Sequence, residues 1–209
     1  PNFIYRAELR PDERRYVDQW GLKNTAQKDN DGNTGERDID VNIEKAWDIT
    51  TGSNQVVVAV IDTGVDYKSE DMAPNAWVNE QELNGQPNID DDGNGFVDDI
   101  HGYDFVNDDG EPLDDHGHGS HCAGTIGARG NNGHGIAGIN WQVKVLPVKF
   151  ISKDGLGSLA GALESIKYAV DNGAKILNNS WGGFPKSQAL KDMIMYANEN
   201  GVLFVASAG

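Results

Sequence analysis

The feature of this sequence that most constrains its fold is an uninterrupted apolar segment at residues 56–61. It reads Val-Val-Val-Ala-Val-Ile and ends abruptly in Asp62, Thr63 and Gly64. A strand with one solvated face alternates apolar and polar residues, so a continuous apolar run predicts a strand of a parallel sheet, covered on both faces. Polar groups that follow such strands collect at the carboxyl edge of the sheet, where α/β proteins place their functional sites.

The segments that follow alternate between helical and strand patterns. Helices are expected over residues 118–128, 159–172 and 187–200. Strands are expected over residues 143–150, 174–178 and 202–206. Ser158 is a candidate N-cap, and Gly173 and Gly201 are candidate helix ends. The sequence therefore predicts an α/β fold, a doubly wound parallel sheet with helices on both faces.

Two regions depart from this alternation. Residues 1–55 are mixed and polar, with a short helix expected over residues 41–49 that Gly52 would close. We interpret them as an arm packed on one domain that spans residues 56–209. Residues 66–115 are acidic and expected to be loop.

Charge narrows the possible partners. The chain has 17 Lys and Arg against 33 Asp and Glu, a formal net charge of −16, which disfavours nucleic acid and anionic membranes as partners. No stretch approaches the ~18 apolar residues of a membrane span, and the chain opens without the basic and apolar segments of a signal peptide. The acidic residues gather in Gly- and Asn-rich loops such as residues 90–99, which favours cation binding.

Two motifs carry acid–base chemistry when taken together. Asp62 ends the apolar strand, and residues 116–124 read His-Gly-His-Gly-Ser-His-Cys-Ala-Gly at the start of an expected helix. A carboxylate at a strand end can hold an imidazole in one tautomer, ready to accept a proton. Cys122 is the only cysteine, and we expect it to be a small buried apolar residue.

The stretches AVIDTG and HGSHCAG resemble those of the subtilisin-like serine protease family. The likeness runs from about Asp12 to the last residue, the N-terminal part of that family's catalytic domain. It implies a serine endopeptidase with an Asp-His-Ser triad, in which Asp62 orients His118 and His118 is the general base. His118 is preferred to His116 and His121 because it is the histidine followed by Gly-Ser-His-Cys-Ala-Gly.

The resemblance also implies where a polypeptide substrate binds. Two segments match the family's cleft edges, which hold an extended peptide by strand addition. The residues concerned are Gly155, Leu156, Gly157, Ser180, Trp181 and Gly182. Glycine in such an edge permits close approach of two backbones.

The family's nucleophile serine and oxyanion-hole asparagine have no counterpart in the 209 residues. The stretch VLFVASAG resembles the strand that leads to that asparagine, no GTSMA-type segment follows, and no Gly-x-Ser-x-Gly elbow replaces it. We therefore expect a fold that is incomplete at its C-terminus and a chain that is inactive alone. Its expected partners are the C-terminal remainder of the same protease and an inhibitory propeptide, and its expected location is secreted or extracytoplasmic.

Calcium is the expected cofactor, with two or more ions. One acidic loop places oxygen ligands on alternate residues around Gly95, as EF-hand loops do. The expected ligands are Asp90, Asp92, Asn94, Phe96 and Asp98. His101 stands at the twelfth position in place of a bidentate Glu, so Asp99 or a distant group must complete the coordination.

A second calcium site is implied by the resemblance alone. Its expected side-chain ligands are Asp12, Asp71 and Asn132, with the carbonyls of Arg129, His134 and Ile136 as neighbours. A third oxygen cluster, Asp29-x-Asp31-x-Asn33, is more typical of a plain loop.

Two other classes of function remain. His116-x-His118-x-x-His121 resembles the histidine cluster of metallo-β-lactamase-like zinc hydrolases. Ser120 stands where that pattern has an Asp, however, and no histidine follows His134, so zinc ligands are scarce. The other class is a catalytically inactive, calcium-dependent module that binds peptides.

Overall fold

The computed structural model describes residues 9–29, 31–183 and 186–208. Within them a single parallel sheet has the strand order β2-β3-β1-β4-β5. The strands are β1 (Gly52–Asp62), β2 (Tyr103–Asp104), β3 (Gln142–Lys149), β4 (Ile176–Asn179) and β5 (Leu203–Ala206). The helices are α1 (Ile43–Trp47), α2 (Glu80–Leu83), α3 (His118–Gly127), α4 (Leu159–Asp171) and α5 (Gln188–Glu199), with single 3₁₀ turns at Tyr16–Asp18 and Ala73–Asn75.

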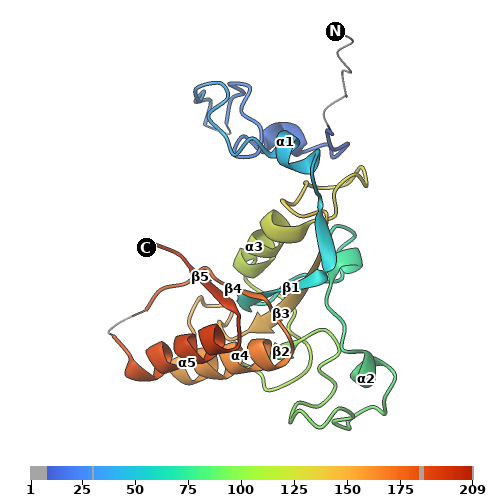
Figure 1. Ribbon diagram of the computed structural model, residues 1–209, viewed down its shortest axis with the longest axis vertical. Helices are drawn as coiled ribbons and strands as arrows, with labels where there is room; N and C mark the ends of the chain where they lie inside the picture. The colour runs from blue at the N-terminus through green and yellow to red at the C-terminus, as the bar shows by residue number, and fades with distance from the viewer. Residues whose placement is uncertain (1–8, 30, 184–185, 209) are drawn as a thin grey trace.

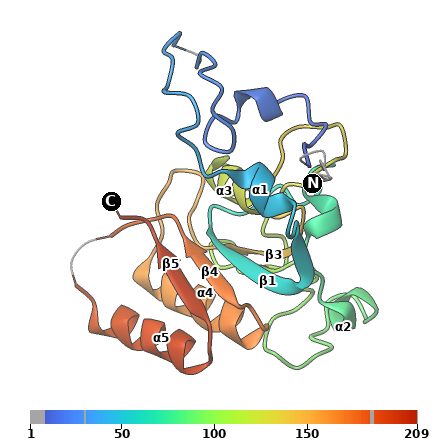
Figure 2. The same ribbon diagram turned by 45° about the horizontal axis from the view of Figure 1, so that its top comes forward.

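Helices cover both faces of the sheet, as the apolar run predicts. Alternate residues of β1 enter two different cores: Val58 and Val60 pack on the side of α3, and Ala59 and Ile61 pack on the side of α4 and α5. Figures 1 and 2 show α3 on one side of the sheet and α4 with α5 on the other. The prediction of a doubly wound α/β fold is confirmed.

The helix ends follow the local signals in the sequence. The Ser158 hydroxyl accepts the Gly161 N–H at 2.9 Å, and the Ser187 hydroxyl accepts the Leu190 N–H at 3.2 Å, so both serines are N-caps. Gly173 follows α4 with φ of +81°, a conformation that glycine adopts at little cost. The predicted bounds of α4 and α5 are therefore close to those observed.

Two expectations about element bounds were wrong. Gly52 does not close the first helix, because α1 ends at Trp47; instead Gly52 begins β1 before the expected boundary at residue 56. A Cβ on Gly52 would overlap the Gln142 carbonyl, so glycine lets β1 approach β3. Strand β2 lies in the region expected to be loop, because two residues are too few to show a periodic pattern.

Apolar residues of the arm, residues 9–29 and 31–55 in the described chain, form a small separate core together with the loop before β3. The Trp47 ring packs at a tilt of 54° against Trp141 with ring centroids 4.8 Å apart, and its indole N–H donates to the Ile139 carbonyl at 2.9 Å. In Figure 1 the arm and the loop that carries α2 lie toward opposite ends of the molecule. Among the described residues, no helix has both the length and the apolar character that crossing a membrane requires.

Candidate active site

The structure brings Asp62 and His118 into direct contact at the carboxyl end of β1. Asp62 is fully buried, and its Oδ1 lies 2.7 Å from His118 Nδ1. The Thr63 N–H also donates to Oδ1, whereas Oδ2 is buried and has no partner among the described residues. This contact places the imidazole proton on Nδ1 and leaves Nε2 able to accept one. The His118 side chain is 45% exposed, so Nε2 is accessible to a reacting group.

Asp114, which the sequence did not single out, organises the start of α3. Its Oδ1 accepts the N–H groups of His116 (2.9 Å) and Gly117 (2.8 Å), and its Oδ2 accepts the Ser120 N–H (2.9 Å) and hydroxyl (2.6 Å). Burial favours the protonated carboxyl, but these hydrogen bonds outweigh it and lower the pKa of Asp114 to about 2. Asp114 lies three residues before the N-cap Gly117, and an Asp so close to a helix start, where N–H groups lack partners, is a local signal that could have revealed it.

Close backbone contact seats α3 against the end of β1. The Gly119 N–H donates to the Thr63 hydroxyl at 2.9 Å, and that hydroxyl donates to Asp114 at 2.9 Å. A Cβ at Gly119 would overlap the Gly64 carbonyl, so the glycine after His118 is required for this approach.

The remaining histidines do not converge on a metal site. The His116 and His118 rings are 6.5 Å apart, and His121 is exposed. In the described part of the chain, the three histidines do not form a cluster of potential metal ligands, which disfavours the zinc hydrolase. Cys122 is only partly buried, beside Asp62 and His118, and burial raises the pKa of its thiol.

The two segments expected to bind a peptide meet at one cavity of about 390 Å³. Gly155, Leu156 and Gly157 line one part of it, and Trp181 and Gly182 line another. The Trp181 indole N–H donates to the carbonyl of Ile61 at 3.0 Å, which ties the cavity to the residue before Asp62.

Ser180 is the exception among the expected peptide-binding residues. It lies outside the cavity lining, and its hydroxyl accepts the Asn178 amide at 2.9 Å.

The acidic loop gathers around a carboxylate that the sequence did not assign to it. Oxygens of Glu82, Asp90 and Asp92 lie within 4.8 Å of one another. Glu82 is buried in α2, and its carboxylate accepts the N–H groups of Asp91 (2.7 Å), Asp92 (3.1 Å) and Asp98 (3.0 Å). Three carboxylates at one point fit a hard cation such as calcium. Glu82 is thus a distant group in place to complete the loop, but it precedes the motif instead of following it.

The other expected groups of this loop support its shape. Asp99 is buried and accepts hydrogen bonds from Tyr168 (2.6 Å), Asn79 (2.8 Å) and Asn94 (3.0 Å). Burial raises the pKa of Asp99 to about 6, although these bonds oppose the shift. The Asp98 carboxylate accepts the Asn88 N–H at 2.8 Å.

Phe96 lies at the base of the same loop. Its ring packs edge-on against Tyr103, Phe105 and Tyr168, which joins the loop to β2 and α4.

Residues expected at the second metal site come from distant segments that hydrogen bonds link. The Asn132 amide donates to Asp71 at 3.0 Å, and the Gly133 N–H donates to Asp12 at 2.8 Å. Glu13, which the sequence did not single out, is buried beside them. Its Oε1 accepts the Asn132 N–H at 3.0 Å, and its Oε2 has no hydrogen-bond partner among the described residues. Oxygen donors with one unpaired carboxylate oxygen suit calcium, but among the described residues the carboxylates of Asp12, Glu13 and Asp71 do not come within 4.8 Å of one another as those of Glu82, Asp90 and Asp92 do.

Arg129 and Ile136 contact Asp71 through their backbone N–H groups, whereas their carbonyls were the expected neighbours of the ion. The Arg129 N–H donates to the Asp71 carbonyl at 2.8 Å, and the Ile136 N–H donates to the Asp71 carboxylate at 3.1 Å. His134 folds over the loop and contacts the Asn132 carbonyl at 2.8 Å. A Cβ at Gly135 would overlap the Asp71 carboxylate.

Asp29 accepts N–H groups from Asp31 and Asn33 at 3.0 and 2.8 Å. This is the local turn expected of a plain loop.

A buried Asp62 paired with His118 at the carboxyl end of a parallel strand, beside a glycine-rich cavity, is the arrangement of a serine protease fold of the subtilase class. The sequence model described as Subtilase family matches residues 53–209, and the chain belongs to this family. It is similar to Subtilisin-like protease 1 of Plasmodium berghei (strain Anka), at 41% identity over 77% of this chain and 27% of that protein. It is also similar to Thermophilic serine proteinase of Bacillus sp. (strain AK1), at 33% identity over 100% and 43%, and to Thermitase of Thermoactinomyces vulgaris, at 34% over 79% and 50%. The chain thus spans 27–50% of the length of these three relatives.

Proposed function

We propose that this chain supplies the acid–base pair, the peptide-binding edge and the calcium sites of a serine endopeptidase. The observation that carries the proposal is the 2.7 Å contact between the buried Asp62 carboxylate and His118 Nδ1, beside a cavity lined by glycine-rich edges. Family membership and relatives that are named as proteases support it.

The proposed mechanism is acyl transfer. An extended peptide binds at the cavity edge near Gly157, and a serine hydroxyl attacks its carbonyl carbon while His118 Nε2 accepts the hydroxyl proton. Asp62 holds the imidazole and stabilises its positive charge. His118 then donates the proton to the leaving amine, and water repeats the sequence to release the acid.

We propose that the serine and the oxyanion donor come from a segment outside these 209 residues. Neither of the family's motifs for them occurs in the sequence, and the relatives are longer than this chain. The exposed apolar side chains of Leu203 and Val205 on β5 also fit a covering segment. An inhibitory propeptide would occupy the same peptide-binding edge.

We propose calcium as the cofactor. Glu82, Asp90 and Asp92 would hold one ion, and Asp12 and Asp71, with Glu13 and Asn132, a second. A bound cation neutralises carboxylates that otherwise repel one another, and so stabilises the loops that carry them.

We propose a secreted or extracytoplasmic location, which suits calcium sites with the dissociation constants of extracellular modules, about 10⁻⁴–10⁻³ M. Detection of the whole protein only in the cytosol of its host would contradict this location.

A serine-reactive fluorophosphonate tests the proposed function. We expect no labelling of the 209-residue chain and labelling of a single serine in the longer protein that contains it. His118→Ala in the longer protein should abolish this labelling, whereas His121→Ala, at an exposed histidine of the same helix, should preserve it. Labelling of a serine within the 209 residues would refute the assignment. A longer protein that binds peptides and calcium but is never labelled would instead be the catalytically inactive binding module.

A further inference from the structure

Lys149 is a buried cation at the catalytic edge of the sheet that the acid–base mechanism does not use. It is the last residue of β3 and is only 1% exposed. The strand register places it directly beside Asp62 of β1 on one side and Asp104 of β2 on the other. Lysine is almost never fully buried unless its charge is paired.

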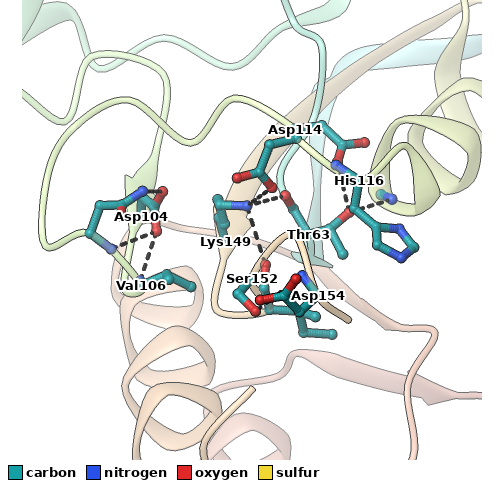
Figure 3. A network of polar contacts seen from close by, with 12 residues as sticks. Thr63, Asp104, Val106, Asp114, His116, Lys149, Ser152 and Asp154 are labelled. Atoms are coloured by element: carbon teal, nitrogen blue, oxygen red, sulfur yellow. Dashed lines mark hydrogen bonds and ion pairs between the residues drawn. The ribbon is translucent and has the colours of Figure 1, made fainter. Parts of the chain in front are cut away.

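The ammonium of Lys149 has three acceptors, one for each of its N–H groups. They are the carbonyl of Thr63 at 2.7 Å, the carboxylate of Asp115 at 2.5 Å and the carbonyl of Ile151 at 3.2 Å. Figure 3 shows Lys149 at the centre of this network, with Asp114 and His116 on one side and Ser152 and Asp154 on the other.

These three acceptors belong to the three segments that build the site. Thr63 follows Asp62, and Asp115 lies in the turn that leads into α3 and His118. Ile151 pairs with Gly157, the edge of the peptide-binding cavity. The Lys149 ammonium is therefore a junction between the acid–base pair and the substrate edge.

We propose that Lys149 is a positioning residue that fixes the placement of the Asp62–His118 pair relative to the peptide-binding edge. The inference rests on the proposed peptidase function. An apolar side chain of similar volume at such a site is often neutral or stabilising, so stability alone does not account for a buried lysine. A requirement for accurate placement does account for the buried lysine, because a misplacement of about 1 Å between reacting groups can lower a rate about 10²-fold.

The test is Lys149→Met in the longer protein, with Lys144→Met as the matched control. Lys144 lies on the same strand and also donates to backbone carbonyls, those of Ala76 (3.1 Å) and Pro74 (3.5 Å), but it lies away from Asp62. Active sites are first titrated with the fluorophosphonate, so that kcat refers to folded sites only. We expect Lys149→Met to lower kcat per titrated site about 10²-fold while KM changes less than about threefold, and Lys144→Met to change neither.

A purely structural role gives a different result. Lys149→Met would then lower Tm and the titratable fraction but leave kcat per site unchanged, and this outcome overturns the proposal. If Lys149→Met does not fold, Asp115→Ala removes the paired carboxylate from a side chain that is 48% exposed. We expect it to lower kcat per site about tenfold, and an unchanged kcat would also overturn the proposal.

A second measurement does not depend on peptidase activity. In the 209-residue chain, ¹⁵N spectra of His118 report which ring nitrogen carries the proton while the imidazole is neutral. We expect the Nδ1–H tautomer in the wild type and in Lys144→Met, and a mixture of tautomers in Lys149→Met. Absence of turnover in the longer protein would refute the proposed function, whereas the same tautomer in all three proteins would refute the role of Lys149.

Discussion

Replacement of Glu82 by Gln tests whether the acidic loop binds calcium through the carboxylate that completes it. Glu82 is buried in α2, and its two oxygens accept the N–H groups of Asp91, Asp92 and Asp98. Glutamine has nearly the same shape, but it has no charge, and its NH₂ group must face at least one of these donors. The substitution therefore changes chemistry at constant volume.

The expected magnitude has two parts. Hydrogen bonds to charged groups contribute about 1.5–3 kcal/mol each, so the loss of one in the metal-free Glu82→Gln protein costs at most about that much, because the substitution also relieves the repulsion between Glu82 and the carboxylates of Asp90 and Asp92. A ligand at a hundredfold excess over Kd stabilises the native state by about 2.7 kcal/mol. In a domain of this size, that corresponds to about 5–11 °C in Tm. A hundredfold loss of affinity would leave an increment of about 0.4 kcal/mol from this site.

The assay is thermal unfolding with calcium and with chelator. We compare the calcium-induced increase in Tm between variants, so that any loss of stability in the metal-free protein does not affect the result. Glu80→Gln is the matched control, because Glu80 is exposed on the same helix. We expect the control to keep the full increment and Glu82→Gln to keep only the part from the site at Asp71. Equal increments in all three proteins would refute the assignment of Glu82, and a wild type without any increment would refute the calcium proposal itself.

Three further predictions concern the active site and the second metal site. Asp62→Asn in the longer protein should lower kcat about 10⁴-fold with little change in KM, as the comparable change does in another serine protease triad; near-normal turnover of a peptide substrate would contradict this. The pKa of Asp114 is depressed to about 2 from 3.8, so its stabilisation is present above pH ~4 and is lost as the pH falls toward 2. In the wild type, the free energy of unfolding should therefore fall by less than about 2 kcal/mol over this pH range, because the group is partly exposed, and Asp114→Asn should lack this part of the pH dependence. An unchanged pH profile in Asp114→Asn would count against this role. Gly135→Ala should lower Tm and weaken calcium binding, because the new Cβ meets the Asp71 carboxylate. Gly133→Ala, also at positive φ but in open space, is the control and should cost only about 1–2 kcal/mol. Equal losses in the two variants would show that backbone strain alone is responsible.

Local signals in the sequence located the main helices and strands, and the resemblance of two short motifs to a known family located the acid–base pair. The apolar run into Asp62 predicted a central strand covered on both faces, because its periodicity depends only on neighbouring residues. Ser158 and Gly173 marked the ends of α4 for the same reason, since capping is a contact within one helical turn. Such signals fail for β2, where the pairing with β3 creates the strand and the two residues show no pattern.

Only the tertiary structure revealed the roles of residues that contact other segments of the chain. In the sequence, Glu82 resembles any surface glutamate of a short helix, yet folding buries it under a loop in which three N–H groups, those of Asp91, Asp92 and Asp98, donate to its carboxylate. Glu13 is likewise selected by a donor that packing brings to it, the N–H of Asn132.

Lys149 is the clearest case. By itself the sequence predicts only a polar end to a strand, since a charged residue there normally lies in solvent. The fold buries its ammonium because Thr63, Asp115 and Ile151 bring three acceptors to one point. Periodicity and capping are set within a few residues of chain, whereas burial of a charge depends on partners that only the folded chain assembles.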